Sequence, residues 1–328
     1  MSISEDFLHR KPLMDKVMVN KSPFPYLFAD HVIGDDIIEK MLTHWPTGEE
    51  QTPEGYNEGV YIHHVGMDGA YNFFPNMSLD RREFWNGCTE DVLKPIVEDA
   101  LSRLLPSLDW VRLQDLANHP DIRIQHLMLM ESRRGYRPHP AHTHFCHSPH
   151  WLMTLLIYLD DASESDRGTR IVEFLPSRQS ADDLATVCAR IDEHFYLTPD
   201  PLQHAGNVRL HEVPFSRGSV LAFLETPDAV HAGPPLERAA RTGARRRLVR
   251  MHISAHPEMV QRSFGVPHAD FSSLAKDPAA QSGAVYEIYR RVMERPGLDG
   301  NGPSHLSVGV DFSQQGLNGI VHIEDPIQ

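Results

Sequence analysis

Five histidines crowd into twelve residues of this sequence, at His139, His142, His144, His147 and His150. The chain has 21 histidines, so their number alone means little, but this crowding lies directly before an apolar run. Neutral imidazole is the commonest metal ligand in proteins, because either ring nitrogen can offer a lone pair. The expected chemistry of the cluster is therefore metal binding.

A single later histidine, His231, could complete such a site. It follows the apolar run 220–224 and precedes the arginine run Arg245-Arg246-Arg247. An iron site that activates O2 takes three protein ligands on one face, usually two histidines and a carboxylate, and leaves the other positions open. A pair of ligands close in sequence and a third on a strand that folds back beside them would meet this need.

The elements that must position these residues are mostly strands. Residues 121–130 alternate with apolar side chains on both faces, and residues 151–159 form a continuous apolar run. Both patterns are typical of strands that are buried on both sides. Further strands are expected at 168–175, 208–213, 220–224 and 248–254.

Helical patterns lie before, within and after this β-rich part. Apolar residues recur at helical spacing in four segments: 37–45, 89–105, 181–193 and 285–293. Pro95 suits a first helical turn, so the second helix is expected to start near Lys94. Residues 47–80, rich in Gly, Asn and Tyr, are expected to be irregular. The pattern predicts a mainly β fold with flanking helices and a double-stranded β-helix (jelly-roll, cupin-like) core.

We expect residues 1–328 to form a single domain. Residues 1–120 would supply a helical and irregular support. Residues 121–254 would form the jelly-roll core, interrupted by an insertion at 176–206, and residues 255–328 would extend it.

The order of the pieces resembles the Fe(II)/2-oxoglutarate-dependent oxygenase superfamily. The resemblance covers roughly residues 21–46 and 121–254. The pieces that carry it are Pro23-Phe24-Pro25-Tyr26, Trp45-Pro46, Gly135-Tyr136, His142-Thr143, Thr154-Leu155-Leu156-Ile157-Tyr158-Leu159, Gly168-Thr169, Gly218 to Phe223, His231 and the arginine that begins the next strand.

The resemblance implies an enzyme that uses Fe(II), 2-oxoglutarate and O2. Its substrate would be a small molecule or carrier-bound metabolite, as in secondary metabolism, and hydroxylation would be the usual outcome. His142 would be the first iron ligand and His231 the distal one. An arginine would pair the far carboxylate of 2-oxoglutarate in two hydrogen bonds. Arg247, directly before the apolar run, and Arg245, at the family's Gly-x-Arg spacing, are the candidates; Arg246 points to the other face.

The sequence departs from the family at the second ligand. The family has Asp or Glu two residues after the first histidine, and this chain has His144. We expect His144 to be a third neutral ligand beside His142 and His231. Water or chloride in the vacant position remains an alternative, since the family's halogenases carry a small residue there and His139-Pro140-Ala141 has that form. The His-x-Asp/Glu strings elsewhere are expected to be loops or caps: 119–121, 268–270 and 322–324.

The remaining histidines are expected to have lesser roles. His147 and His150 would be outer residues of the site or loop residues. His126 would line the core or a pocket, and His204 and His211 would lie at the surface.

Two other classes of protein remain open. A three-histidine cupin-type dioxygenase that does not use 2-oxoglutarate would need no arginine at Arg245 or Arg247. A non-catalytic binding module would hold zinc in a closed site of four ligands, for which Cys146 is the one cysteine near the cluster.

The composition narrows the partners and the compartment. The net charge of −14 makes a nucleic-acid partner unexpected, because an acidic chain repels phosphate backbones. No run approaches the ~20 apolar residues of a membrane span, and residues 1–19 lack the apolar region of a signal peptide. Cys88, Cys146 and Cys188 include no Cys-x-x-Cys pair, so no disulfide framework is indicated. We therefore expect a cytoplasmic protein.

Overall fold

The structure is a computed structural model that describes residues 14, 17–48, 50, 52–54, 57–65, 77–107, 122–133, 144, 151–161, 167–174, 208–226, 229–233, 245–256 and 260. The helices expected at 181–193 and 285–293 lie outside these residues. Within the described ranges, no helix is long and apolar enough to cross a membrane. The division of the chain into support, core, insertion and extension stays a prediction.

The described residues form two antiparallel sheets. Within them, the larger sheet has eight strands in the order β1-β2-β9-β6-β11-β5-β4-β3, and the smaller has three in the order β10-β7-β8. The strands are β1 (Met18–Asn20), β2 (Tyr26–Ala29), β3 (Thr52–Glu54), β4 (Asn57–Val65), β5 (Arg123–Ser132), β6 (Trp151–Tyr158), β7 (Arg167–Phe174), β8 (Val208–Pro214), β9 (Val220–Leu224), β10 (His231–Ala232) and β11 (Arg246–Ser254).

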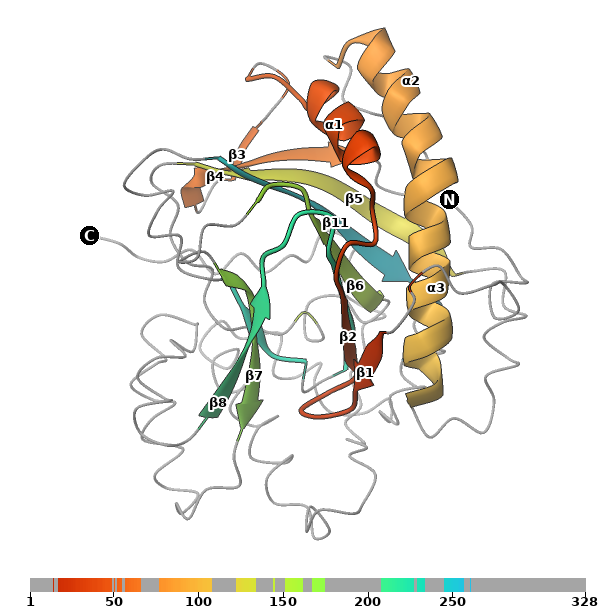
Figure 1. The fold of residues 1–328 in the computed structure, drawn as a ribbon, viewed down its shortest axis with the longest axis vertical. Coiled ribbons are helices and arrows are strands. Elements are labelled where there is room, and N and C mark those ends of the chain that lie inside the picture. The colour runs from red at the N-terminus through yellow and green to blue at the C-terminus, as the bar shows by residue number, and fades with distance from the viewer. Residues whose placement is uncertain are drawn as a thin grey trace, which may run out of the picture.

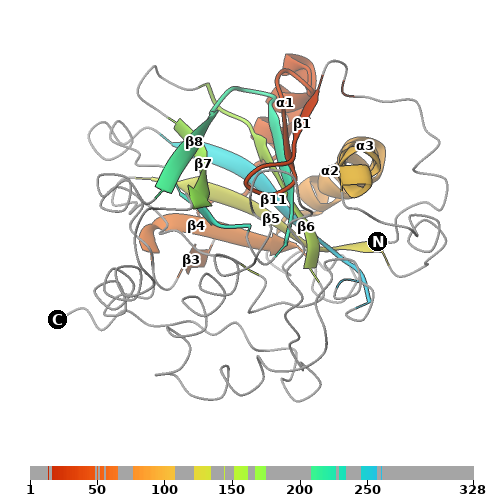
Figure 2. The same ribbon diagram turned by 90° about the horizontal axis from the view of Figure 1, so that it is seen from below.

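Helices cover the outer face of the larger sheet. They are α1 (Asp35–Thr43), α2 (Leu79–Cys88) and α3 (Lys94–Leu104), with a π-helical turn at Thr89–Leu93 and a 3-10 turn at Leu105–Ser107. Figures 1 and 2 show these helices on one side of the larger sheet and β7 and β8 on the other. The predicted class, a mainly β fold with flanking helices and a core of two facing sheets, is confirmed.

The central strands bury both faces, each against a different layer. Leu155 and Ile157 of β6 belong to the apolar core shared with the helices, whereas Leu156 and Tyr158 belong to the core shared with the smaller sheet. Because successive side chains alternate between faces, a strand between two apolar layers must be apolar throughout. This alternation decides which side chains of β6 and β11 reach the space between the sheets.

Two expectations for the N-terminal part have different outcomes. α3 begins at Lys94 with Pro95 in its first turn, as predicted. The irregular segment expected at 47–80 was wrong in part, because β3 and β4 lie there, β4 pairs with β5, and α2 begins at Leu79. β4 carries the strong strand formers Val60, Tyr61, Ile62 and Val65, and the Gly- and Asn-rich composition of the whole segment hid this short strand signal.

Candidate metal centre

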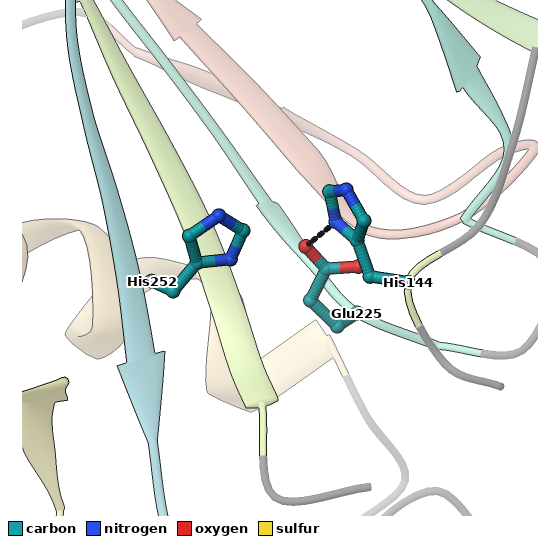
Figure 3. Close-up of side chains that lie close together, drawn as sticks. All are labelled: His144, Glu225 and His252. Atoms are coloured by element: carbon teal, nitrogen blue, oxygen red, sulfur yellow. Dashed lines mark hydrogen bonds and ion pairs between the residues drawn. The ribbon is translucent and has the colours of Figure 1, made fainter. Parts of the chain in front are cut away.

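Imidazole and carboxylate side chains from separate elements meet between the two sheets. His144 precedes β6, Glu225 follows β9, His252 lies on β11 and His231 begins β10. One nitrogen or oxygen from each of His144, Glu225 and His252 lies within 4.8 Å of the others. Figure 3 shows these three side chains close together. All of these residues are buried.

Strand register explains why residues so far apart in sequence meet. Thr154 of β6 is the cross-strand neighbour of His252 on one side and of Phe223 on the other. Side chains directly opposite one another share a face, so Thr154 and His252 both point between the sheets. Glu225 directly follows β9 beside them. His231 enters from the smaller sheet, where it is opposite Ile171 of β7.

A hydrogen-bond network is centred on Glu225. The Thr154 hydroxyl donates to Oε1 of Glu225, and His144 Nδ1 lies 2.9 Å from the same oxygen. Thr154 Oγ1 also lies 3.2 Å from His252 Nδ1. A hydroxyl has a single hydrogen, which Thr154 gives to Glu225, so His252 Nδ1 must be the donor in the second contact. This assignment leaves the lone pair of neutral His252 on Nε2.

Among the described residues, two buried atoms of this network have no hydrogen-bond partner: Glu225 Oε2 and His252 Nε2. A buried polar atom left without a partner costs about 1–3 kcal/mol. Such atoms therefore indicate a place that a bound group completes. Imidazole is a usual ligand of non-haem Fe(II), and a carboxylate beside it can either coordinate the metal or hydrogen-bond a ligating ring, so the residues present fit that metal.

Electrostatics at the site follow from its burial. Burial raises the pKa of Glu225 to about 7, against the opposing effects of His231, Thr154 and Arg250. Burial also lowers the pKa of His252 well below its usual value, and the nearby charge of Arg250 acts in the same direction. His252 is therefore neutral, which is the form that binds metals. A cation at the site would favour the ionised form of Glu225.

His231 is held in an orientation that suits a ligand. Its Nδ1 lies 3.1 Å from the carbonyl oxygen of Ala229, and a carbonyl only accepts, so Nδ1 carries the proton and Nε2 the lone pair. The ring packs on Phe223, with centroids 4.7 Å apart, and lies 4.8 Å from the ring of His144. The structure thus brings together two of the histidines predicted as ligands, His144 and His231.

The third predicted ligand, His142, lies outside the described residues. The same holds for the other members of the histidine cluster, for the small residue of the halogenase alternative and for one predicted surface histidine: His139, His147, His150, Ala141 and His204. His126 is described, and its ring centroid lies 6.0 Å from that of His252. It lines this site, as expected for a pocket residue.

The two arginines predicted to bind 2-oxoglutarate are not brought to the cluster. Arg247 pairs with Asp160, through its backbone N–H at 2.6 Å and its guanidinium Nε at 3.1 Å. The side chain of Arg245 is 62% exposed and lies 3.3 Å from Glu131. Both share a face of β11 with Val249, which packs in the core on the helix side.

A different arginine lies on the face of the site. Arg250 is two residues from His252 and shares its face, and its charge acts on both Glu225 and His252. Its Nε is buried and has no hydrogen-bond partner among the described residues. Sequence reasoning missed Arg250, Glu225, Thr154 and His252; the period of two along 246–254 was the one signal that could have paired Arg250 with His252.

No protein-family model matches the chain, and no curated protein matches it. Among solved structures it is similar to a prolyl 4-hydroxylase from Phytophthora capsici, with 15% identity and a TM-score of 0.45 over 89% of this chain and 79% of that chain. For a Pseudomonas putida prolyl-4-hydroxylase the identity is 13% and the TM-score 0.37, over 70% and 92% of the two chains.

A third similar structure is HygX from Streptomyces hygroscopicus with nickel and 2-oxoglutarate bound. Its identity is 14% and its TM-score 0.41, over 70% of this chain and 82% of that chain.

Proposed function

We propose that the chain is an Fe(II)/2-oxoglutarate-dependent oxygenase that hydroxylates a C–H bond of a small molecule or carrier-bound metabolite. The observation that carries the proposal is the buried group of His144, Glu225 and His252 between the two sheets, with the ring of buried His231 lying 4.8 Å from that of His144. Histidines and a carboxylate from four separate elements, with donor atoms left for a bound group, are typical of a mononuclear iron centre.

The histidines hold the metal in this proposal. His144 and His231 offer imidazoles whose centroids are 4.8 Å apart, and His142 is the third proposed ligand. Iron bound there with 2-oxoglutarate would supply the activation of O2 and the oxidative decarboxylation of the cosubstrate. A site with three protein ligands would leave room beside the metal for these partners.

Arg250 is the residue that we propose for the cosubstrate, in place of Arg247 or Arg245. Two residues along a strand span about 7 Å, which suits a diacid that reaches from the metal to a guanidinium. The buried Nε of Arg250 offers a hydrogen bond that no described residue accepts. A guanidinium matches a carboxylate in two hydrogen bonds.

Aromatic side chains keep the site dry. The ring of Trp151 lies 3.8 Å from that of His252 and 5.2 Å from that of His144, and Phe223 covers His231. Water excluded in this way strengthens electrostatic interactions and protects reactive species from side reactions. The chain's own part is to place the substrate carbon and the cosubstrate in this dry space.

The proposal is tested by turnover of the cosubstrate. Purified protein loaded with Fe(II) is given 2-oxoglutarate and O2, and succinate is measured with and without a library of small metabolites. We expect succinate that depends on iron and on 2-oxoglutarate, and less of it from the Arg250→Met variant. A chain that binds iron but forms no succinate would contradict the proposal and favour a dioxygenase that does not use 2-oxoglutarate.

A further inference from the structure

We propose that Glu225 supplies, from outside the coordination sphere, the negative charge that the family's missing carboxylate would have given to the metal. In this arrangement His144 stands between the metal and the carboxylate. Nδ1–H of His144 donates to Glu225, and Nε2 of His144 faces the metal. The inference rests on the proposed function for the identity of the metal.

His144 and Glu225 are in direct contact. His144 Nδ1 and Glu225 Oε1 are 2.9 Å apart, and both residues are buried. An ionised carboxylate only accepts hydrogen bonds, so Nδ1 carries the proton and the lone pair of a neutral His144 is on Nε2. A ligating histidine that gives its other N–H to a carboxylate is held in one tautomer, and its basicity rises.

A buried divalent cation that is held by neutral imidazoles has no counter-ion among its protein ligands, and an uncompensated buried charge is costly. Among the described residues, one group of histidine, cysteine and acidic side chains is close enough to share an ion, and Glu225 is its carboxylate. Glu225 is completely buried, which a carboxylate seldom is unless it is paired.

Glu225 is itself held by two hydrogen-bond donors. The Thr154 hydroxyl donates to the same oxygen that accepts from His144, and Thr154 in turn accepts from His252. Two donors on one oxygen fix the carboxylate on the His144 side. Thr154, Glu225 and His144 therefore form a connected path from the β6–β11 pair to the proposed metal position.

A double-mutant cycle on metal binding tests the inference. Co(II) is titrated anaerobically into the apo forms of the wild type, Glu225→Gln, His144→Asp and the double variant, with affinity read from the visible absorption. Gln keeps an oxygen that accepts from His144 and Thr154 but removes the charge. Glu131→Gln is the matched control, because Glu131 is equally buried and bonds Trp45 away from the cluster.

We expect Glu225→Gln to weaken Co(II) binding by about 10–100-fold, the usual effect of losing an outer-sphere partner. In the His144→Asp background the same change should cost less than about threefold, since residues that act through one another are not additive. The Co(II) band positions should persist in Glu225→Gln, because no ligand is removed. Glu131→Gln should bind Co(II) as the wild type does.

Three results would overturn the inference. Equal affinity of Glu225→Gln and wild type would show that the charge does not matter. An equal loss in both backgrounds, with altered band positions, would show that Glu225 is itself a ligand. Absence of Co(II) binding by the wild type would overturn the proposed function as well, so the two failures are distinguishable.

Discussion

Thr154→Val is the perturbation whose effect can be worked out most fully. Valine matches the shape of threonine but removes the hydroxyl that donates to Glu225 and accepts from His252 Nδ1. Thr154 is 1% exposed, so water cannot replace the hydroxyl. His252 Nδ1 loses its hydrogen bond to Thr154, and Glu225 Oε1 keeps only the one from His144.

The expected cost is the sum of two effects. A hydrogen bond to a charged group, as Glu225 is above its pKa of about 7, contributes about 1.5–3 kcal/mol, and an unsatisfied buried group costs about 1–3 kcal/mol. Since valine recovers part of this by its apolar methyl group, we expect a loss of about 2–4 kcal/mol in the free energy of unfolding of the apo protein. Most domains can lose that much and still fold.

Urea unfolding of the apo protein measures the loss, with Thr89→Val as the matched control. Thr89 is also 1% exposed, and its hydroxyl donates to the carbonyl oxygen of Trp85 within the helical segment. We expect the control to lose about 1 kcal/mol and to bind Co(II) unchanged, whereas Thr154→Val should bind Co(II) about tenfold more weakly. If Thr154→Val were no less stable than Thr89→Val and bound Co(II) equally well, the network around Glu225 would be refuted.

Other predictions concern the arginines, an acid-sensitive contact and a buried thiol. Arg250→Met should raise the KM for 2-oxoglutarate by about 10–100-fold and leave Co(II) binding unchanged. Arg247→Met should leave that KM unchanged. It should lower the stability measured by urea unfolding, because Asp160 loses its partner. Burial alone would raise the pKa of Glu50, but hydrogen bonds from Thr47, Ser78 and Arg81 outweigh it and lower that pKa. The stability that ionised Glu50 contributes is thus present above its unfolded pKa and is lost as pH falls through the lower folded pKa. Glu50→Gln should therefore be less stable than the wild type at pH 7 and should lose less stability on acidification. An acid unfolding profile equal to that of the wild type would contradict this. Burial raises the pKa of Cys88 to about 12, so in a variant without the other two cysteines a thiol reagent should label it only after unfolding.

The fold was predictable because its strongest signals are periodic. The continuous apolar run of β6 and the alternating β5 indicate strands buried on both faces, and α1 and α3 show helical spacing around Pro95. β4 was missed because Val60, Tyr61 and Ile62 form only a short run within a Gly- and Asn-rich segment.

The site was predictable in part. His144 and His231 stand out by their surroundings in the sequence, and the structure brings their rings to 4.8 Å. Glu225 and His252 do not stand out, because their meeting depends on the register that places Thr154 opposite His252. A one-residue change of that register would turn these side chains to the other face.

The choice of arginine shows the same limit. Alternation along β11 divides its arginines into two sets, but the sequence does not say which set faces the helices. In the structure Arg247 lies on the helix side, paired with Asp160, and Arg250 lies on the side of the site. Val249 packs on the helix side of β11 and Leu248 on the other side, which places Arg250 and His252 on the face of the site.

The most direct test of the central claim is a visible spectrum of the anaerobic protein with Fe(II), before and after 2-oxoglutarate is added. A cosubstrate that chelates iron through its keto and carboxylate oxygens gives a weak charge-transfer band, which needs neither O2 nor knowledge of the substrate. We predict that this band appears in the wild type, is weakened in Glu225→Gln and needs more 2-oxoglutarate in Arg250→Met. A chain that binds Fe(II) but shows no band at saturating 2-oxoglutarate would contradict the claim that this is a 2-oxoglutarate-dependent iron centre.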